Sequence, residues 1–169
     1  METASADRRP PPSDARSSAS SVPADIGDFD ELYRSSYASM VRLAAAIVDT
    51  VPDAEQVVQD AFVSLFRRWA TIENPGGYLR ISVVNGARQV LRRRAIARRL
   101  TLRSEPVDLG FDHLRDAVRA LPPSQRVLVA LRYEQQMSDS EIATELGLAI
   151  GTVKSRLHRA LARLREEMP

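Results

Sequence analysis

The chain has 169 residues, 44% hydrophobic and 27% charged, but only 5% aromatic, which favours one or two small helical bundles with cores of Leu, Val, Ile and Ala. The absence of cysteine excludes disulfides and thiolate zinc sites, and two distant histidines, His113 and His158, argue against a metal centre, a cofactor or histidine-based catalysis. The formal net charge is only +2, so the distribution of the basic residues, all arginine except Lys154, carries more information than the total.

The first 26 residues, "METASADRRPPPSDARSSASSVPADI", are rich in Ser, Pro and Ala and contain almost no large apolar side chains. We expect residues 1–26 to form a disordered tail, because they cannot offset the entropy of ordering. A transit peptide is the alternative, but four acidic residues argue against it. No apolar run approaches the roughly 20 residues of a membrane span, and a signal peptide is lacking, so a cytoplasmic protein without membrane insertion is expected.

Three helices are expected over residues 27–95. In "DFDELYRSSYASMVRLAAAIV", Asp28 and Glu31 have capping-box spacing, and large apolar side chains recur at helical intervals. The second helix, "PDAEQVVQDAFVSLFRRW", has Pro52 in its first turn and one apolar face. The third, "ENPGGYLRISVVNGARQVLRRR", is expected to start after a turn at residues 74–77. These helices predict a three-helix domain.

A linker and a second domain follow. The stretch "RRRAIARRLTLRSEPVD" is basic and then polar, and its helical periodicity does not continue beyond Leu100, which predicts a flexible linker over residues 96–110. "FDHLRDAVRAL", "PPSQRVLVALRYEQQM" and "SDSEIATELGLAIGTVKSRLHRALARLR" predict a four-helix domain over residues 111–169. The fold class is therefore all-α, with two small helical domains.

The last of these stretches has the pattern of a helix-turn-helix. Ser138 and Glu141 have capping-box spacing, and Gly147 suits a tight, left-handed end to the first helix. The outer face of the second helix carries small polar and cationic side chains: Thr152, Lys154, Ser155, Arg156 and Arg159. Such a face fits the major groove of DNA. The alternative is a solvated basic helix, against which the tight turn and the capped first helix weigh.

The first domain carries two further candidate surfaces. On its second helix Gln56, Asp60 and Val63 lie opposite the core, as expected of a docking surface, although one exposed Val is more often harmless. Aromatic, amide and guanidinium side chains that suit single-stranded DNA lie on and before the third helix: Trp69, Asn74, Tyr78, Asn85, Arg88 and Arg92. Taken alone, this domain favours the alternative in which Trp69 belongs to the core and the arginines are solvated.

Three stretches together resemble one family, the extracytoplasmic-function sigma factors of bacterial RNA polymerase, of the sigma-70 superfamily. They are "DAEQVVQDAFVSLFRRW", "NPGGYLRISVVNGARQVLRRR" and "LPPSQRVLVALRYEQQMSDSEIATELGLAIGTVKSRLHRAL", similar to the family's polymerase-docking helix, promoter-melting helix and fourth-region helix-turn-helix. The resemblance implies a transcription initiation factor without catalysis, whose first domain is sigma region 2 and whose second is sigma region 4. It implies as partners the clamp and flap of the polymerase core and promoter DNA, with an anti-sigma factor as a candidate further partner.

The resemblance also assigns roles by position. It places Gln56, Gln59 and Asp60 in the clamp-binding surface, with Val63 beside them, and Asn85 in the melting motif for the minus-ten element. The outer residues of the helix-turn-helix would read the minus-thirty-five element. The chain departs from the family pattern at three positions. Gln56 stands where the family commonly has an acidic residue, Gln89 where it has an Asp, and Ala149 where it has a Ser. The alternative function is a stand-alone helix-turn-helix regulator that binds operator DNA.

Overall fold

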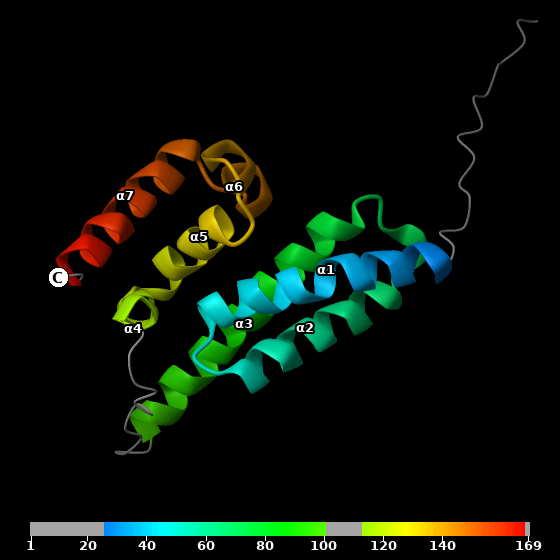
Figure 1. The fold of residues 1–169 in the computed structure, drawn as a ribbon, viewed down its shortest axis with the longest axis horizontal. Helices are drawn as coiled ribbons and strands as arrows, with labels where there is room; N and C mark the ends of the chain where they lie inside the picture. The colour runs from blue at the N-terminus through cyan, green and yellow to red at the C-terminus, as the bar shows by residue number, and fades with distance from the viewer. Residues whose placement is uncertain (1–25, 101–112, 168–169) are drawn as a thin grey trace, which may run out of the picture.

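The computed structural model describes residues 26–100 and 113–167. Within these ranges the chain is entirely helical, which confirms the all-α prediction. The elements are α1 (Ile26–Ile47), α2 (Val51–Phe66), a 3-10 turn η1 (Trp69–Thr71), α3 (Pro75–Leu100), α4 (His113–Ala120), α5 (Pro123–Tyr133), α6 (Asp139–Leu146) and α7 (Ile150–Glu167). We call α1–α3 the amino-terminal bundle and α4–α7 the carboxy-terminal bundle (Figure 1).

The amino-terminal bundle forms because each of its helices has one apolar stripe. The buried members include Leu43 and Ile47 of α1, Val58 and Leu65 of α2, and Val83 of α3. Burial of each such side chain stabilises the fold by about 1.5–3 kcal/mol.

Gly86 of α3 packs against Val57 of α2. A Cβ atom added there would lie 3.0 Å from Cγ1 of Val57, so a larger residue would force the Val57 side chain to move.

The helix boundaries differ from the sequence prediction at three places. Helix α1 begins at Ile26, so Asp28 lies inside the first turn and the predicted capping box there is wrong. An acidic side chain interacts favourably with the helix dipole both just before the helix and within its first turn. The presence of Asp28 therefore does not show at which residue α1 begins. Helix α3 begins at Pro75 rather than after a turn at 74–77, because Asn74 Oδ1 accepts a hydrogen bond from Gly77 N–H at 2.9 Å and caps the helix.

Helix α3 also continues to Leu100, five residues past the predicted domain boundary at residue 95. The added segment consists mainly of Ala and Arg, which are strong helix formers. Residues 101–110 of the predicted linker and residues 1–25 of the predicted tail lie outside the described residues.

The carboxy-terminal bundle is organised around α5. Val127, Leu128 and Leu131 are fully buried, as the sequence pattern predicts. The burial extends further, because all seven residues from Gln125 to Leu131 are buried, on every side of the helix. Helices α6 and α7 pack on one side of α5 and α1 packs on another, so the amino-terminal bundle covers a face that this small bundle cannot cover itself (Figure 1).

None of the helices in the described ranges combines the length and the apolar character that a membrane span requires. In the same residues no group of three His, Cys, Asp or Glu side chains is placed to hold a metal ion.

Candidate nucleic-acid interface

The first helix of the helix-turn-helix, α6, is capped as predicted. Ser138 Oγ accepts a hydrogen bond from Glu141 N–H at 3.2 Å, and Glu141 Oε2 accepts one from Ser138 N–H at 2.7 Å. The hydrogen bond from the Ser138 side chain holds the pKa of Glu141 below its usual value, so the capping carboxylate stays ionised. The two reciprocal bonds fix where α6 begins.

The turn between α6 and α7 is equally well defined. Gly147 has φ 64°, the left-handed conformation that a residue with a Cβ adopts only at a cost. Leu148 N–H donates to Ala143 O at 2.9 Å, which satisfies a carbonyl at the end of α6. Ala149 is the residue before α7, and its carbonyl accepts from Thr152 N–H at 2.9 Å, but its methyl side chain cannot cap the helix.

Helix α7 presents the predicted outward face. Val153, Leu157, Ala160 and Leu164 are buried against the bundle. The five candidate DNA-binding residues are brought together on the remaining surface, with Lys154, Ser155 and Arg159 exposed and Thr152 and Arg156 partly buried.

The polar groups of this face bond to their own helix. Ser155 Oγ donates to Thr152 O and Arg159 Nε donates to Ser155 O, each at 3.2 Å. These bonds are local and exposed, so they are readily exchanged for bonds to a ligand. The face can therefore offer hydroxyl and guanidinium groups to a base edge and cations to phosphates.

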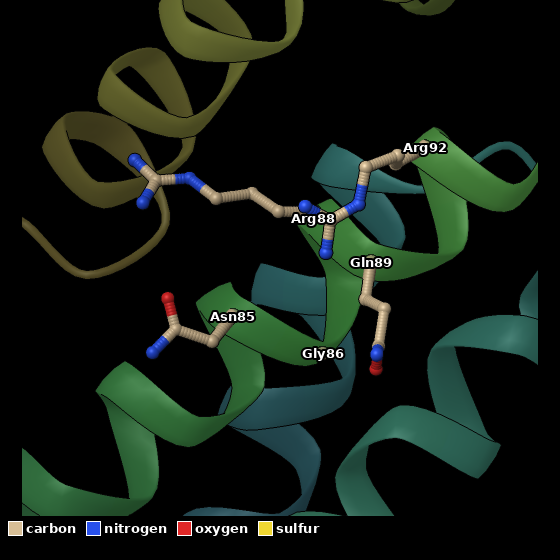
Figure 2. A pocket seen from close by; sticks show the side chains of 5 residues that line it. All are labelled: Asn85, Gly86, Arg88, Gln89 and Arg92. Atoms are coloured by element: carbon tan, nitrogen blue, oxygen red, sulfur yellow. The ribbon is translucent and has the colours of Figure 1, made fainter. Parts of the chain in front are cut away.

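A second candidate surface lies on α3. Asn85, Arg88 and Arg92 line an open pocket of about 580 Å³ together with Gly86 and Gln89 (Figure 2). The Arg88 side chain extends from α3 toward the helices of the carboxy-terminal bundle (Figure 2). Burial, and to a smaller extent the positive charge of Arg156 of α7, lower the pKa of Arg88.

Three candidates at or just before the start of α3, Trp69, Asn74 and Tyr78, have partners inside the protein. Trp69 is partly buried and meets the ring of Phe29 edge to face, with centroids 5.3 Å apart and an interplanar angle of 88°. The Tyr78 hydroxyl lies 2.8 Å from Ser64 Oγ, and Asn74 caps α3. These contacts match the core alternative for Trp69, and the assignment of Trp69, Asn74 and Tyr78 to DNA binding stays a prediction.

The candidate docking surface on α2 is exposed. Gln56, Gln59 and Asp60 lie on one side of the helix, and Gln56 Nε2 donates to Asp60 Oδ1 at 2.9 Å. Val63 follows one turn later with 51% of its surface exposed. Sequence reasoning missed Phe66, which is 54% exposed and extends this apolar area. Phe66 lies three residues after Val63, so helical periodicity could have placed the two side chains on the same face.

The arginines near the end of α3 differ in exposure and in ion pairing. Arg92 and Arg93 are exposed, whereas Arg94 bends back and pairs with Asp53 and with Asp49, the latter at 3.6 Å. Sequence reasoning missed Asp49, a single acidic residue in the loop between α1 and α2. The side chains of Arg98 and Arg99 lie outside the described residues.

A model of the family described as "Sigma-70, region 4" matches residues 111–164, which contain α4 to α7 up to Leu164. Among curated proteins, the RNA polymerase sigma-E factor of Streptomyces coelicolor is 37% identical over 155 residues, which cover 85% of this chain and 88% of the relative. The ECF RNA polymerase sigma factor SigM of Mycobacterium tuberculosis is 34% identical over 90% of this chain and 83% of the relative.

Solved structures share the fold. The sigma factor RpoE of Bartonella quintana, solved in complex with the anti-sigma factor NepR, matches 83% of this chain and 96% of that chain with a TM-score of 0.69 at 24% identity. CnrH, solved in complex with the cytosolic domain of CnrY, matches 86% of this chain and 90% of that chain with a TM-score of 0.66 at 22% identity.

Proposed function

The chain belongs to the extracytoplasmic-function sigma factors of bacterial RNA polymerase, and on that premise we propose that it is a transcription initiation factor. It binds RNA polymerase core and directs the enzyme to specific promoters. It acts by binding rather than by catalysis, in the cytoplasm and at the nucleoid.

The observation that carries this proposal is the presence of two separate exposed surfaces on two different bundles. Helix α7 carries a capped, cationic face of the size and chemistry that the major groove accepts. Helix α2 carries an acidic and apolar face on the other bundle. A repressor needs only the first of these surfaces, whereas a sigma factor needs both.

We assign the roles as follows. The α7 face contacts the minus-thirty-five element as duplex DNA, with Arg159 toward a base edge and Lys154 toward phosphate. The α3 face, with Asn85, Arg88 and Arg92, holds the melted minus-ten element. The α2 face, centred on Asp60, docks on the clamp of the polymerase, and the carboxy-terminal bundle touches the flap.

The test is co-purification with RNA polymerase core followed by a run-off transcription assay on a promoter library. We expect the chain to bind core and to produce discrete transcripts that are absent with core alone. A chain that binds duplex operator sites tightly without core, and yields no transcripts with it, would be a stand-alone regulator instead.

A further inference from the structure

Gln89 is an exposed amide in the open pocket on α3. It lines this pocket, of about 580 Å³, together with Asn85, Arg88 and Arg92 (Figure 2). Gln89 lies four residues after Asn85 and three before Arg92, so it is a neighbour of both on the helix surface. Gln89 therefore lies among the residues that we assign to the melted minus-ten element.

The Gln89 side chain has no bonding partner within the part of the chain that the structure describes. Other amides of the protein do have such partners. Gln56 donates to Asp60 Oδ1 at 2.9 Å, and Gln135 donates to Ser39 Oγ at 3.0 Å. The Gln89 amide can thus bond to a ligand without breaking a side-chain hydrogen bond inside the protein.

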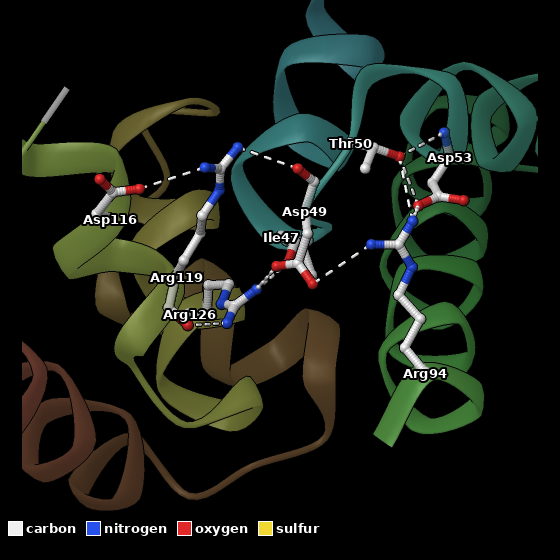
Figure 3. Close-up of polar contacts among 8 residues, drawn as sticks. All are labelled: Ile47, Asp49, Thr50, Asp53, Arg94, Asp116, Arg119 and Arg126. Atoms are coloured by element: carbon white, nitrogen blue, oxygen red, sulfur yellow. Dashed lines mark hydrogen bonds and ion pairs between the residues drawn. The ribbon is translucent and has the colours of Figure 1, made fainter. Parts of the chain in front are cut away.

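The neutral charge of Gln89 also keeps the neighbouring arginines available. Arg94 shows what a nearby carboxylate does, because it bends back and pairs with Asp53 (Figure 3). Arg92 and Arg93 are exposed and form no ion pair with any described residue. A carboxylate at position 89 would lie three and four residues before them, at the spacings that form ion pairs on a helix. With Gln89 in that place, both cations stay free to meet phosphates.

An amide and a carboxylate also prefer different bases. The amide of glutamine has an acceptor and a donor side by side, whereas an ionised carboxylate has acceptors only. Adenine presents the N6 amino donor next to the N7 acceptor, so an amide can bond to both atoms. A carboxylate would accept from N6 but would face the lone pair of N7, and it is better matched to the N4 amino group of cytosine.

We propose that Gln89 is a specificity-determining residue that reads an adenine of the melted minus-ten element through N6 and N7, while Arg92 holds a neighbouring phosphate. This inference rests on the proposed function, because it concerns the base that the α3 face selects. It sets this chain apart from family members that carry an Asp at this position, whose carboxylate favours cytosine.

The test replaces the amide by a carboxylate of the same length. Holoenzyme is assembled from the full chain and RNA polymerase core, and run-off transcripts are sequenced from a promoter library randomised across the minus-ten element. The parent should select adenine at one position. Gln89→Glu should shift the ratio of adenine to cytosine at that position by about fivefold or more toward cytosine and leave the other positions unchanged. Gln89→Ala should lose the preference without gaining another.

A matched control separates base reading from a general effect of charge. Gln136→Glu makes the same change at an exposed residue between α5 and α6, and it should keep the base preference of the parent. Gln89→Glu should also flatten the salt dependence of promoter binding, because the new carboxylate competes with phosphate for Arg92. Transcription that Gln89→Glu gains on cytosine promoters shows that this variant is folded and bound to core.

The outcomes separate this inference from the proposed function. Transcripts with no adenine preference in the parent, an unchanged preference in Gln89→Glu or Gln89→Ala, or an equal shift in Gln136→Glu would overturn base reading by Gln89. The proposed function would stand in each of these cases, since the holoenzyme still initiates. A parent that yields no transcripts with core would overturn the proposed function, and the assignment of Gln89 with it.

Discussion

Helices α3 and α7 both present arginines on the side away from their own bundle core, but the arginines of the two helices have different kinds of bonding partner. On α7, the bond of Arg159 goes to the backbone of its own helix, four residues away. On α3, Arg80 and Arg94 reach other elements and form ion pairs with residues 65 and 41 positions distant in the sequence. The α7 face is therefore built locally and is ready to bind, whereas the arginines of α3 serve the packing of the molecule as well.

This difference predicts that changes on an exposed surface affect one activity, whereas changes among the arginines of α3 affect several. The largest single effect is expected on the α2 surface. Asp60→Arg should weaken binding to RNA polymerase core by about 2–5 kcal/mol, because it places a cation where the proposed interface accepts a carboxylate. Binding titrations with labelled core measure this.

The matched control for Asp60 is Glu55→Arg, an equal charge change at another exposed position of α2. It should leave core affinity within about 0.5 kcal/mol of the parent. Equal losses from both variants would mean that the whole helix responds to net charge, and Asp60 would lose its assigned role.

The next prediction tests whether α7 distinguishes one DNA sequence from another. Arg159→Ala should cost about 1–3 kcal/mol at the preferred upstream element and relax the preference at one base pair, because Arg can contact a guanine edge with two hydrogen bonds. Lys154→Ala should weaken all sequences alike, because a phosphate contact carries no sequence information. A panel of single-base promoter variants measures both. A uniform loss on Arg159→Ala would transfer base reading to Thr152 and Ser155.

The same contrast between local and long-range contacts explains how much the sequence predicts. The capping box at Ser138 and the left-handed Gly147 are confirmed, because the partners in such motifs lie three to five residues apart and leave a pattern in the sequence. The exposure of Val63 and the burial of Leu128 follow from helical periodicity for the same reason.

What the sequence does not predict depends on partners that are distant in the chain. The sequence pattern of α5 gives no sign that Arg126 is buried, yet it is 6% exposed and donates hydrogen bonds to Ile47 O and Asp49. Arg94 reads as part of a basic run, but it pairs with Asp53. Periodicity describes one helix at a time, so it cannot show which outer face a second bundle covers.

The turn of the helix-turn-helix offers a smaller, purely local change. Gly147→Ala places a Cβ in the left-handed region and should destabilise the protein by about 1–2 kcal/mol. Chemical denaturation measures this loss. Among the described residues, no heavy atom other than those of Gly147 and its two chain neighbours lies within 4 Å of the added Cβ, so any cost beyond backbone strain would contradict a local origin.

The smallest effect is a gain, expected at the start of α7. The carbonyl of Ala149 already accepts hydrogen bonds from Thr152 and Val153 N–H, so the backbone has the arrangement of a helix start while the side chain offers no acceptor. A serine hydroxyl at this position can accept a bond from an N–H in the first turn of α7. Ala149→Ser should therefore stabilise the protein by about 1 kcal/mol in chemical denaturation. Ala149→Val is the control, since it adds bulk without an acceptor and should give no gain. An equal gain from Ala149→Val would show that the added side chain acts by packing rather than by capping, and the missing cap would no longer explain the difference.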